Sequence, residues 1–172
     1  MSIADRILRV KSSLPGQVEL VAVSKTYPAQ RIMEAYEAGQ RIFGENRPQE
    51  MAQKYEELPK DIEWHLIGHL QTNKIKKVLG RASLIQSVDS EHLLAAIEKE
   101  AARAGLVQNV LLEVNIGGEA SKSGVSPEQL WPLLDTAAAQ EHIRVCGLMA
   151  IPPVNDDNAR NRAYLAAVHK LF

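Results

Sequence analysis

Residues 20–39 read LVAVSKTYPAQRIMEAYEAG, and this stretch decides the fold. A short apolar run ends at Val23, a polar turn follows, and Pro28 then stands where proline is favoured, at the start of a helix. Gly39 fits the position just past the helix end, because glycine readily adopts the left-handed backbone that terminates helices. The stretch therefore predicts one strand followed by one helix.

The same strand-then-helix order recurs along the whole chain. Further apolar runs that we expect to be strands lie at residues 41–43, 62–67, 84–88, 110–115 and 143–149. Strands that alternate with helices at this spacing predict a parallel α/β sheet. The runs are mostly apolar rather than alternating, which is typical of strands covered on both faces. An open doubly wound sheet and a (β/α)8 TIM-barrel both fit this pattern.

The length bears on the choice between these folds. No linker-like or low-complexity segment divides the 172 residues, so we expect a single domain over 1–172. A closed barrel of this type has about 250 residues, and at least about 200. If the fold is the barrel, we expect a chain truncated after about six βα units, with the C-terminal units missing and the first and sixth strands left as raw edges.

The composition excludes several classes of protein. The 20 Lys and Arg residues balance 21 Asp and Glu residues, so no excess positive charge favours nucleic acid or a membrane surface. No apolar run approaches the roughly 18 residues that span a bilayer, and the N-terminus lacks the apolar core of a signal peptide. Cys146 is the only cysteine, which excludes an internal disulfide, and it lies within an apolar run, where we expect a buried, unreactive thiol. We expect a cytoplasmic protein.

Lys25 is the most informative single position. It directly follows the first apolar run, so it should lie at the carboxyl end of the sheet, where ligands bind in both candidate folds. We expect its amine to be partly desolvated there, which would leave more of it uncharged and able to attack a carbonyl as a Schiff-base lysine. A lysine that simply extends into solvent from a strand end fits the position equally well.

Two further strand ends carry polar side chains. Asn46 follows the second run and could hydrogen-bond a ligand, although the sequence alone favours asparagine as a helix cap here. His69 follows the third run, four residues after His65, but no third ligand is evident nearby, so we expect no metal site. Gly117 and Gly118 match neither of the glycine-rich nucleotide-binding spacings.

Seven short blocks of sequence, taken in order, carry a specific resemblance to a known family. The blocks are VAVSKT (21–26), FGEN (43–46), WHLIGHLQTNK (64–74), SVD (87–89), VN (114–115), SKSG (121–124) and GLM (147–149). Together they resemble the pyridoxal phosphate homeostasis proteins, small proteins that bind pyridoxal 5'-phosphate (PLP) and are also called proline synthase co-transcribed homologues. The resemblance covers almost the whole chain, from about Val21 to Met149.

The resemblance implies a fold, a cofactor and a site. The fold is the barrel of PLP fold type III, like the N-terminal barrel of alanine racemase. The cofactor is PLP, held as an imine on Lys25, with Asn46 and Met149 lining the ring pocket and His69 nearby. The family implies a protein without catalytic residues that takes part in PLP homeostasis by holding PLP and exchanging it. Apo PLP-dependent enzymes would be the recipients, and we expect a monomer.

The same resemblance predicts a low affinity for PLP in this chain. In the family, the phosphate of the cofactor is held by stretches after the seventh and eighth strands, which residues 1–172 do not include. Each charge-assisted hydrogen bond to a phosphate contributes about 1.5–3 kcal/mol. We therefore expect this chain as written to bind PLP weakly.

Two other activities stay open at this point. A PLP-dependent amino-acid racemase needs acid/base groups on both faces of the substrate's α-carbon, and Tyr27 is the only tyrosine adjacent in sequence to Lys25. A Schiff-base aldolase without PLP would need a general acid/base near Lys25, for which Glu45 and Glu113 are the candidates.

Overall fold

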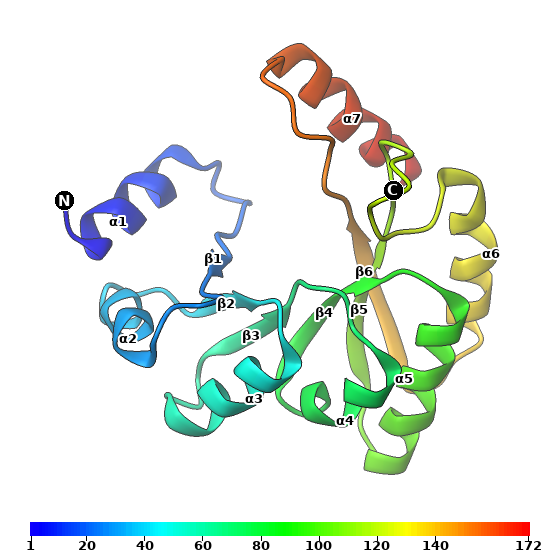
Figure 1. Cartoon of the computed structure of the whole chain (residues 1–172), viewed down its shortest axis with the longest axis horizontal. Coiled ribbons are helices and arrows are strands. Elements are labelled where there is room, and N and C mark those ends of the chain that lie inside the picture. The colour runs from blue at the N-terminus through cyan, green and yellow to red at the C-terminus, as the bar shows by residue number, and fades with distance from the viewer.

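A computed structural model describes all 172 residues and shows six parallel strands with helices between them (Figure 1). The strands are β1 (Ala22–Val23), β2 (Ile42–Glu45), β3 (Glu63–Leu66), β4 (Ala82–Val88), β5 (Gln108–Glu113) and β6 (Ile143–Met149). The helices are α1 (Ile3–Ser13), α2 (Ala29–Glu37), α3 (Pro48–Glu57), the single 3-10 turn η1 (Thr72–Lys74), α4 (Ile75–Val78), α5 (Glu91–Ala104), α6 (Pro127–Ala138) and α7 (Asn158–Leu171).

The strand order decides between the two folds that the sequence left open. The strands neighbour one another in chain order, from β1 at one edge of the sheet to β6 at the other. A doubly wound sheet reverses its order at a switch point, whereas a barrel winds in one direction. The sheet therefore corresponds to six successive βα units of a barrel, as the resemblance implied, and the predicted parallel sheet is confirmed.

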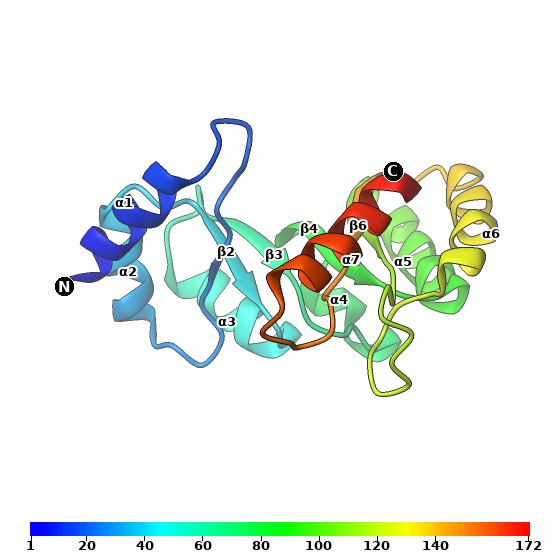
Figure 2. The same cartoon turned by 90° about the horizontal axis from the view of Figure 1, so that it is seen from above.

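The helices from α2 to α6 follow one side of the sheet, and α7 lies away from this row (Figures 1 and 2). Strand side chains that point toward these helices are fully buried: Trp64 is 1% exposed, and Ile85 and Leu112 are 0% exposed. Intervening residues such as Leu111 are only half-buried. The core therefore lies between the sheet and α2–α6, and the carboxyl ends of the strands are left to carry polar groups.

The β6 edge corrects one expectation. Cys146 is exposed rather than buried, although it lies within an apolar strand. The reason is that β6 pairs only with β5, so part of this strand has no neighbour. None of the helices is long and apolar enough to cross a membrane.

Candidate functional site

All four residues that the resemblance assigns to PLP lie at the carboxyl end of the sheet. Lys25 follows β1, Asn46 follows β2, His69 lies in the loop after β3, and Met149 ends β6. The first three therefore stand on neighbouring strands. Met149 lies at the opposite edge of the open sheet, so the structure does not bring it beside Lys25.

The Lys25 side chain is exposed and makes no hydrogen bond or ion pair. The expectation of a partly desolvated amine is wrong for this structure. The physical reason is that β1 has two residues and pairs only with β2, so little protein surrounds the turn that follows it. An unpaired primary amine at this position is nevertheless free to react with an aldehyde.

The turn that carries Lys25 has an unusual backbone. Thr26 has φ +67°, which makes it the only residue other than glycine with a positive φ. The left-handed region costs an L-residue roughly 1–2 kcal/mol, and β-branched residues are rarest there. The Tyr27 N–H donates to the Ser24 carbonyl at 3.1 Å and closes the turn.

A buried charged network lies beneath this turn. The Lys54 Nζ donates to Glu45 Oε1 at 2.6 Å, to Glu50 Oε1 at 2.7 Å and to the Ser24 carbonyl at 2.9 Å. The Ser24 hydroxyl donates to the same Glu45 oxygen at 2.7 Å. Lys54 is only 6% exposed and Glu45 is fully buried, so the bonds among Lys54, Glu45 and Ser24 are shielded from water, whereas the Glu50 side chain is 22% exposed. We call Ser24, Glu45, Glu50 and Lys54 the Lys54 network.

The two carboxylates of the Lys54 network differ in their electrostatics. Burial raises the pKa of Glu45, and the hydrogen bonds from Lys54 and Ser24 only partly oppose this effect. Burial also acts to raise the pKa of Glu50, but the hydrogen bonds from Lys54 and the Thr26 N–H, together with the charges of Lys54 and Arg47, outweigh it and lower this pKa overall. Glu45 is thus engaged beneath the turn, and the suggestion that it serves Lys25 as an aldolase acid/base finds no support in this geometry.

Asn46 does not cap a helix. The residue that precedes α3 as its cap is Arg47, so the interpretation favoured by the sequence alone is wrong. Asn46 is half-buried, and Gly68 packs directly against it. A Cβ added to Gly68 would lie 2.5 Å from the Asn46 carbonyl oxygen and 2.7 Å from its Cα, so only glycine allows the ends of β2 and β3 to approach this closely.

Acidic groups lie near His69. Its Nδ1 is 3.1 Å from Asp89 Oδ2, at the end of β4. Glu113, at the end of β5, is 8% exposed. Burial raises its pKa, the charge of Asp89 raises it further, and His69 acts in the opposite direction. His65 instead contacts Gln86, with 2.9 Å between His65 Nδ1 and Gln86 Nε2, so the two histidines have separate partners. No cluster of three or more metal-ligating side chains is present.

Lys122 is held in place, in contrast to Lys25. Its Nζ lies 2.6 Å from Glu119 Oε2 and donates to the Pro152 carbonyl at 3.0 Å. These contacts fasten the loop after β5 to the chain that follows β6. The amine of Lys122 is therefore already engaged.

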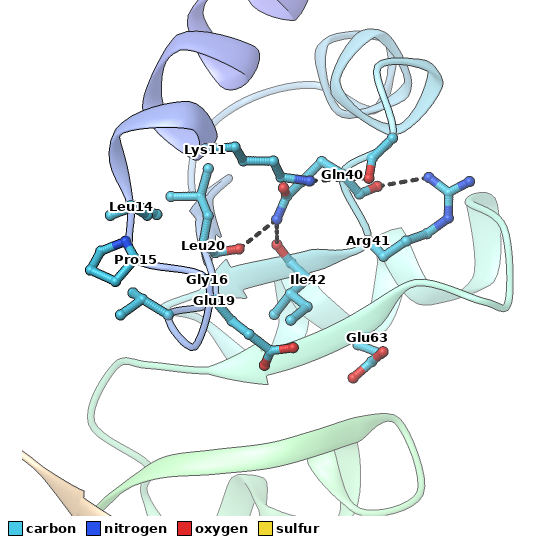
Figure 3. A pocket seen from close by; sticks show the side chains of 12 residues that line it. Lys11, Leu14, Pro15, Gly16, Glu19, Leu20, Gln40, Arg41, Ile42 and Glu63 are labelled. Carbon is cyan, nitrogen blue, oxygen red and sulfur yellow. Dashed lines mark hydrogen bonds between the residues drawn. The ribbon is translucent and has the colours of Figure 1, made fainter.

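A pocket of about 390 Å³ lies at the opposite end of the sheet, where the strands begin (Figure 3). The Gln40 side chain bridges its wall by donating to the carbonyls of Leu20 and Ile42, both at 2.6 Å. The pocket contains none of the four predicted site residues. This pocket therefore lies apart from the predicted site.

Sequence reasoning missed the Lys54 network. One signal was available, since Glu50 and Lys54 are four residues apart and form an ion pair along α3. Such pairs are common on exposed helix faces, and nothing in the sequence shows that this one is buried against the turn after β1.

The sequence pattern of the family described as "Alanine racemase, N-terminal domain" matches residues 1–172. The chain is 44% identical over 154 residues to the pyridoxal phosphate homeostasis protein of Aquifex aeolicus. The aligned segment covers 89% of this chain and 68% of the relative. It is 38% identical over 151 residues to the protein of the same name from Schizosaccharomyces pombe, covering 86% and 64%. The chain thus spans about two thirds of the length of these relatives.

Solved structures agree with these sequence matches. PipY of Synechococcus elongatus with PLP bound is similar at a TM-score of 0.89 and 37% identity, over 98% of this chain and 79% of PipY. An alanine racemase from Clostridium difficile is similar at a TM-score of 0.81 over 97% of this chain and 44% of that enzyme, but at only 14% identity. The second likeness shows a shared fold alone.

Proposed function

The chain belongs to the alanine racemase N-terminal domain family, among the pyridoxal phosphate homeostasis proteins, and from this premise we propose that it binds PLP through Lys25 and holds it for exchange without catalysing turnover. The observation that carries the proposal is an unpaired lysine amine at the carboxyl end of β1.

The residues present fit the aldehyde-bearing part of PLP. An aldehyde condenses with an amine by losing one water, and the resulting imine exchanges when another amine attacks it. Lys25 supplies a free amine for this chemistry. Asn46 stands at the end of the adjacent strand, held there by its contact with Gly68, and offers an amide to hydrogen-bond the ring. We propose that His69 lies near the ring and that Met149 lines its pocket from the far edge of the sheet.

The absence of turnover is also part of the proposal. The relatives with the highest identities quoted above carry the name of homeostasis proteins, whereas the racemase is similar at only 14% identity. Racemisation needs two acid/base groups on opposite faces of the α-carbon. Tyr27 is 54% exposed and makes no side-chain hydrogen bond that would orient it as the second group.

The test is chemical trapping on the purified chain. PLP is added, the visible absorption band of lysine-bound PLP is recorded, and borohydride reduction is followed by peptide mass mapping. We expect the adduct on Lys25 and its loss in Lys25→Ala, with no change in Lys77→Ala, which removes another exposed lysine. An adduct spread over many lysines, or unchanged in Lys25→Ala, would contradict the assignment.

A second measurement separates carrier from racemase. Alanine incubated with the PLP-loaded protein in deuterium oxide should keep its α-proton, while an apo PLP-dependent enzyme mixed with the same protein should gain activity. Incorporation of deuterium at the α-carbon together with formation of the opposite enantiomer would establish the racemase alternative. A cytoplasmic location, a monomeric state and weak binding by these 172 residues stay predictions.

A further inference from the structure

We propose that Glu50 and Lys54 are positioning residues for Lys25: through the Lys54 network they hold the turn of residues 24–26 in the one backbone conformation that presents the lysine amine. That this positioning serves PLP binding rests on the proposed function, whereas the contacts that hold the turn lie within the chain and do not involve PLP.

The first step is that the buried Lys54 ammonium group holds both peptide neighbours of Lys25, directly on one side and through Glu50 on the other. On the N-terminal side, Lys54 Nζ binds the Ser24 carbonyl, and Glu45 accepts the Ser24 hydroxyl. On the C-terminal side, the Thr26 N–H donates to Glu50 Oε1 at 2.7 Å, and this oxygen also accepts from Lys54. Lys25 itself takes no part in these bonds, so its side chain stays free while its backbone is held at both ends.

The second step concerns the backbone strain at Thr26. A threonine with φ +67° persists only where surrounding contacts over-determine the conformation. The hydrogen bond to Glu50 is the contact that the Thr26 N–H makes. Glu50 therefore compensates for a conformation that the sequence would otherwise avoid.

The third step is that the burial of Lys54 restricts the motion of the Lys54 network. Lys54 is a single cation between two carboxylates, and its side chain is 8% exposed. Glu56 of the same helix pairs with Lys60, which lies beyond the helix end, at 3.5 Å with more than half of each side chain exposed, as surface ion pairs usually are. The bonds of Lys54 to Glu45 and to the Ser24 carbonyl hold their geometry more tightly than an exposed pair, because water does not compete for them. The Glu50 side chain is 22% exposed, and its bond to this buried ammonium group orients the oxygen that accepts from the exposed Thr26 N–H.

The consequence for Lys25 follows from orientation. A displacement of about 1 Å in a reacting group can cost roughly a hundredfold in rate. A turn free to leave the left-handed conformation would point the Lys25 amine in other directions for most of the time. The Lys54 network therefore sets how fast Lys25 captures an aldehyde, while Lys25 alone performs the capture.

The test compares four variants of the full chain. Glu50→Ala removes the acceptor for the Thr26 N–H, Glu50→Gln keeps an acceptor oxygen without the charge, and Glu56→Ala is the matched control on the exposed part of α3. The fourth variant combines Glu50→Ala with Thr26→Gly, since glycine adopts positive φ without strain. Each variant is first checked for folding by a urea unfolding curve.

Two readouts are taken. Hydrogen exchange of the Thr26 amide, measured by NMR without PLP, should become about tenfold faster or more in Glu50→Ala and stay slow in Glu50→Gln and Glu56→Ala. The rate constant for formation of the Lys25 adduct with added PLP should fall at least about tenfold in Glu50→Ala. It should recover in Glu50→Gln and in the Thr26→Gly combination, whereas a loss of folding alone would not be rescued by glycine.

The outcomes distinguish this inference from the proposed function. Equal exchange and equal adduct rates in Glu50→Ala and Glu56→Ala would overturn the inference, as would a slower adduct rate without faster Thr26 exchange. If the parent chain forms no adduct on Lys25, the proposed function fails. The turn-holding role is then decided by the exchange measurement, which contains no PLP.

Discussion

Two lysines fasten two strand-end loops in this protein, and they do so in different environments. Lys54 lies beneath the turn after β1 with its side chain 8% exposed, and it joins one carbonyl and two carboxylates. Lys122 lies beside the loop after β5 with its side chain 27% exposed, and it joins one carbonyl and one carboxylate. The contact types are the same, and the difference is access to water.

This difference in exposure indicates that the turn after β1 is held more rigidly than the loop after β5. Removing one partner of a buried ion pair leaves an uncompensated charge in a low-dielectric surrounding, whereas water replaces a lost partner at an exposed site. On the Ser24 side, the turn that carries Lys25 is therefore held by bonds of Lys54 that water cannot replace, whereas the bond of Glu50 to the Thr26 N–H lies at the surface. The loop after β5 is held by interactions that solvent can substitute.

The largest effect is expected when the buried lysine loses its charge. Lys54→Met keeps an unbranched side chain of nearly the same length but leaves Glu45 buried without its cation, which should lower the free energy of unfolding by about 3–5 kcal/mol. Urea unfolding at neutral pH measures this. A loss below 1 kcal/mol, close to that of a surface pair, would remove the contrast between the two lysines.

A smaller effect is expected from the close approach of β2 and β3. Gly68→Ala places a methyl group 2.5 Å from the Asn46 carbonyl oxygen, and the backbone must shift to admit it. Overpacking of this kind costs typically about 1–3 kcal/mol. Gly16→Ala is the control, since nothing lies within 4 Å of its added Cβ. Equal unfolding curves for the two variants would show that the carboxyl ends of β2 and β3 are looser than the structure indicates.

The exposed counterpart of the first prediction is Lys122→Met. Because its pair with Glu119 is partly solvated, we expect a change in the free energy of unfolding of only about 0–1 kcal/mol. The same urea titration used for Lys54→Met gives the comparison directly. A cost as large as that of Lys54→Met would mean that burial does not decide the difference.

The smallest effect is expected at Glu113 and depends on pH. Burial raises its folded-state pKa above the unfolded value of about 4.3, so the stability it contributes is fully present below pH 4.3 and is lost as pH rises through the folded pKa. Glu113→Gln keeps the size of the side chain and removes this loss. The variant should therefore gain stability relative to the parent as the pH rises from about 4 to about 7. Thermal unfolding of both proteins at each pH measures this difference.

The control for this pH dependence is Glu141→Gln, at an exposed position. This variant removes an exposed carboxylate, so the difference between the two variants reports the effect of burial at Glu113. A Glu113→Gln variant that instead loses stability as the pH rises would show that this carboxylate has a stabilising partner when charged.

The order of strands and helices was determined by local sequence patterns. Pro28 and Gly39 bracket α2, with Gly39 at φ +86°, as their conformational preferences predicted. The apolar run 143–149 became β6 with the predicted bounds. These features depend on a few adjacent residues and on the period of the apolar pattern, which the sequence displays directly.

The candidate site was predictable only in part. Because every strand is parallel, the sequence alone placed Lys25, Asn46 and His69 at one end of the sheet. It did not determine that Lys25 is exposed, because that depends on β1 being an edge strand with few neighbours. Nor did it show that Asn46 leaves the capping position of α3 to Arg47.

The Lys54 network was decided by tertiary structure alone. Its members come from the end of β1, from β2 and from α3, and Lys54 is separated from Ser24 by 30 residues. A buried lysine and an exposed one look the same in a sequence. What distinguishes them is which other elements exclude water from the amine, and that is set only when the strands and helices pack together.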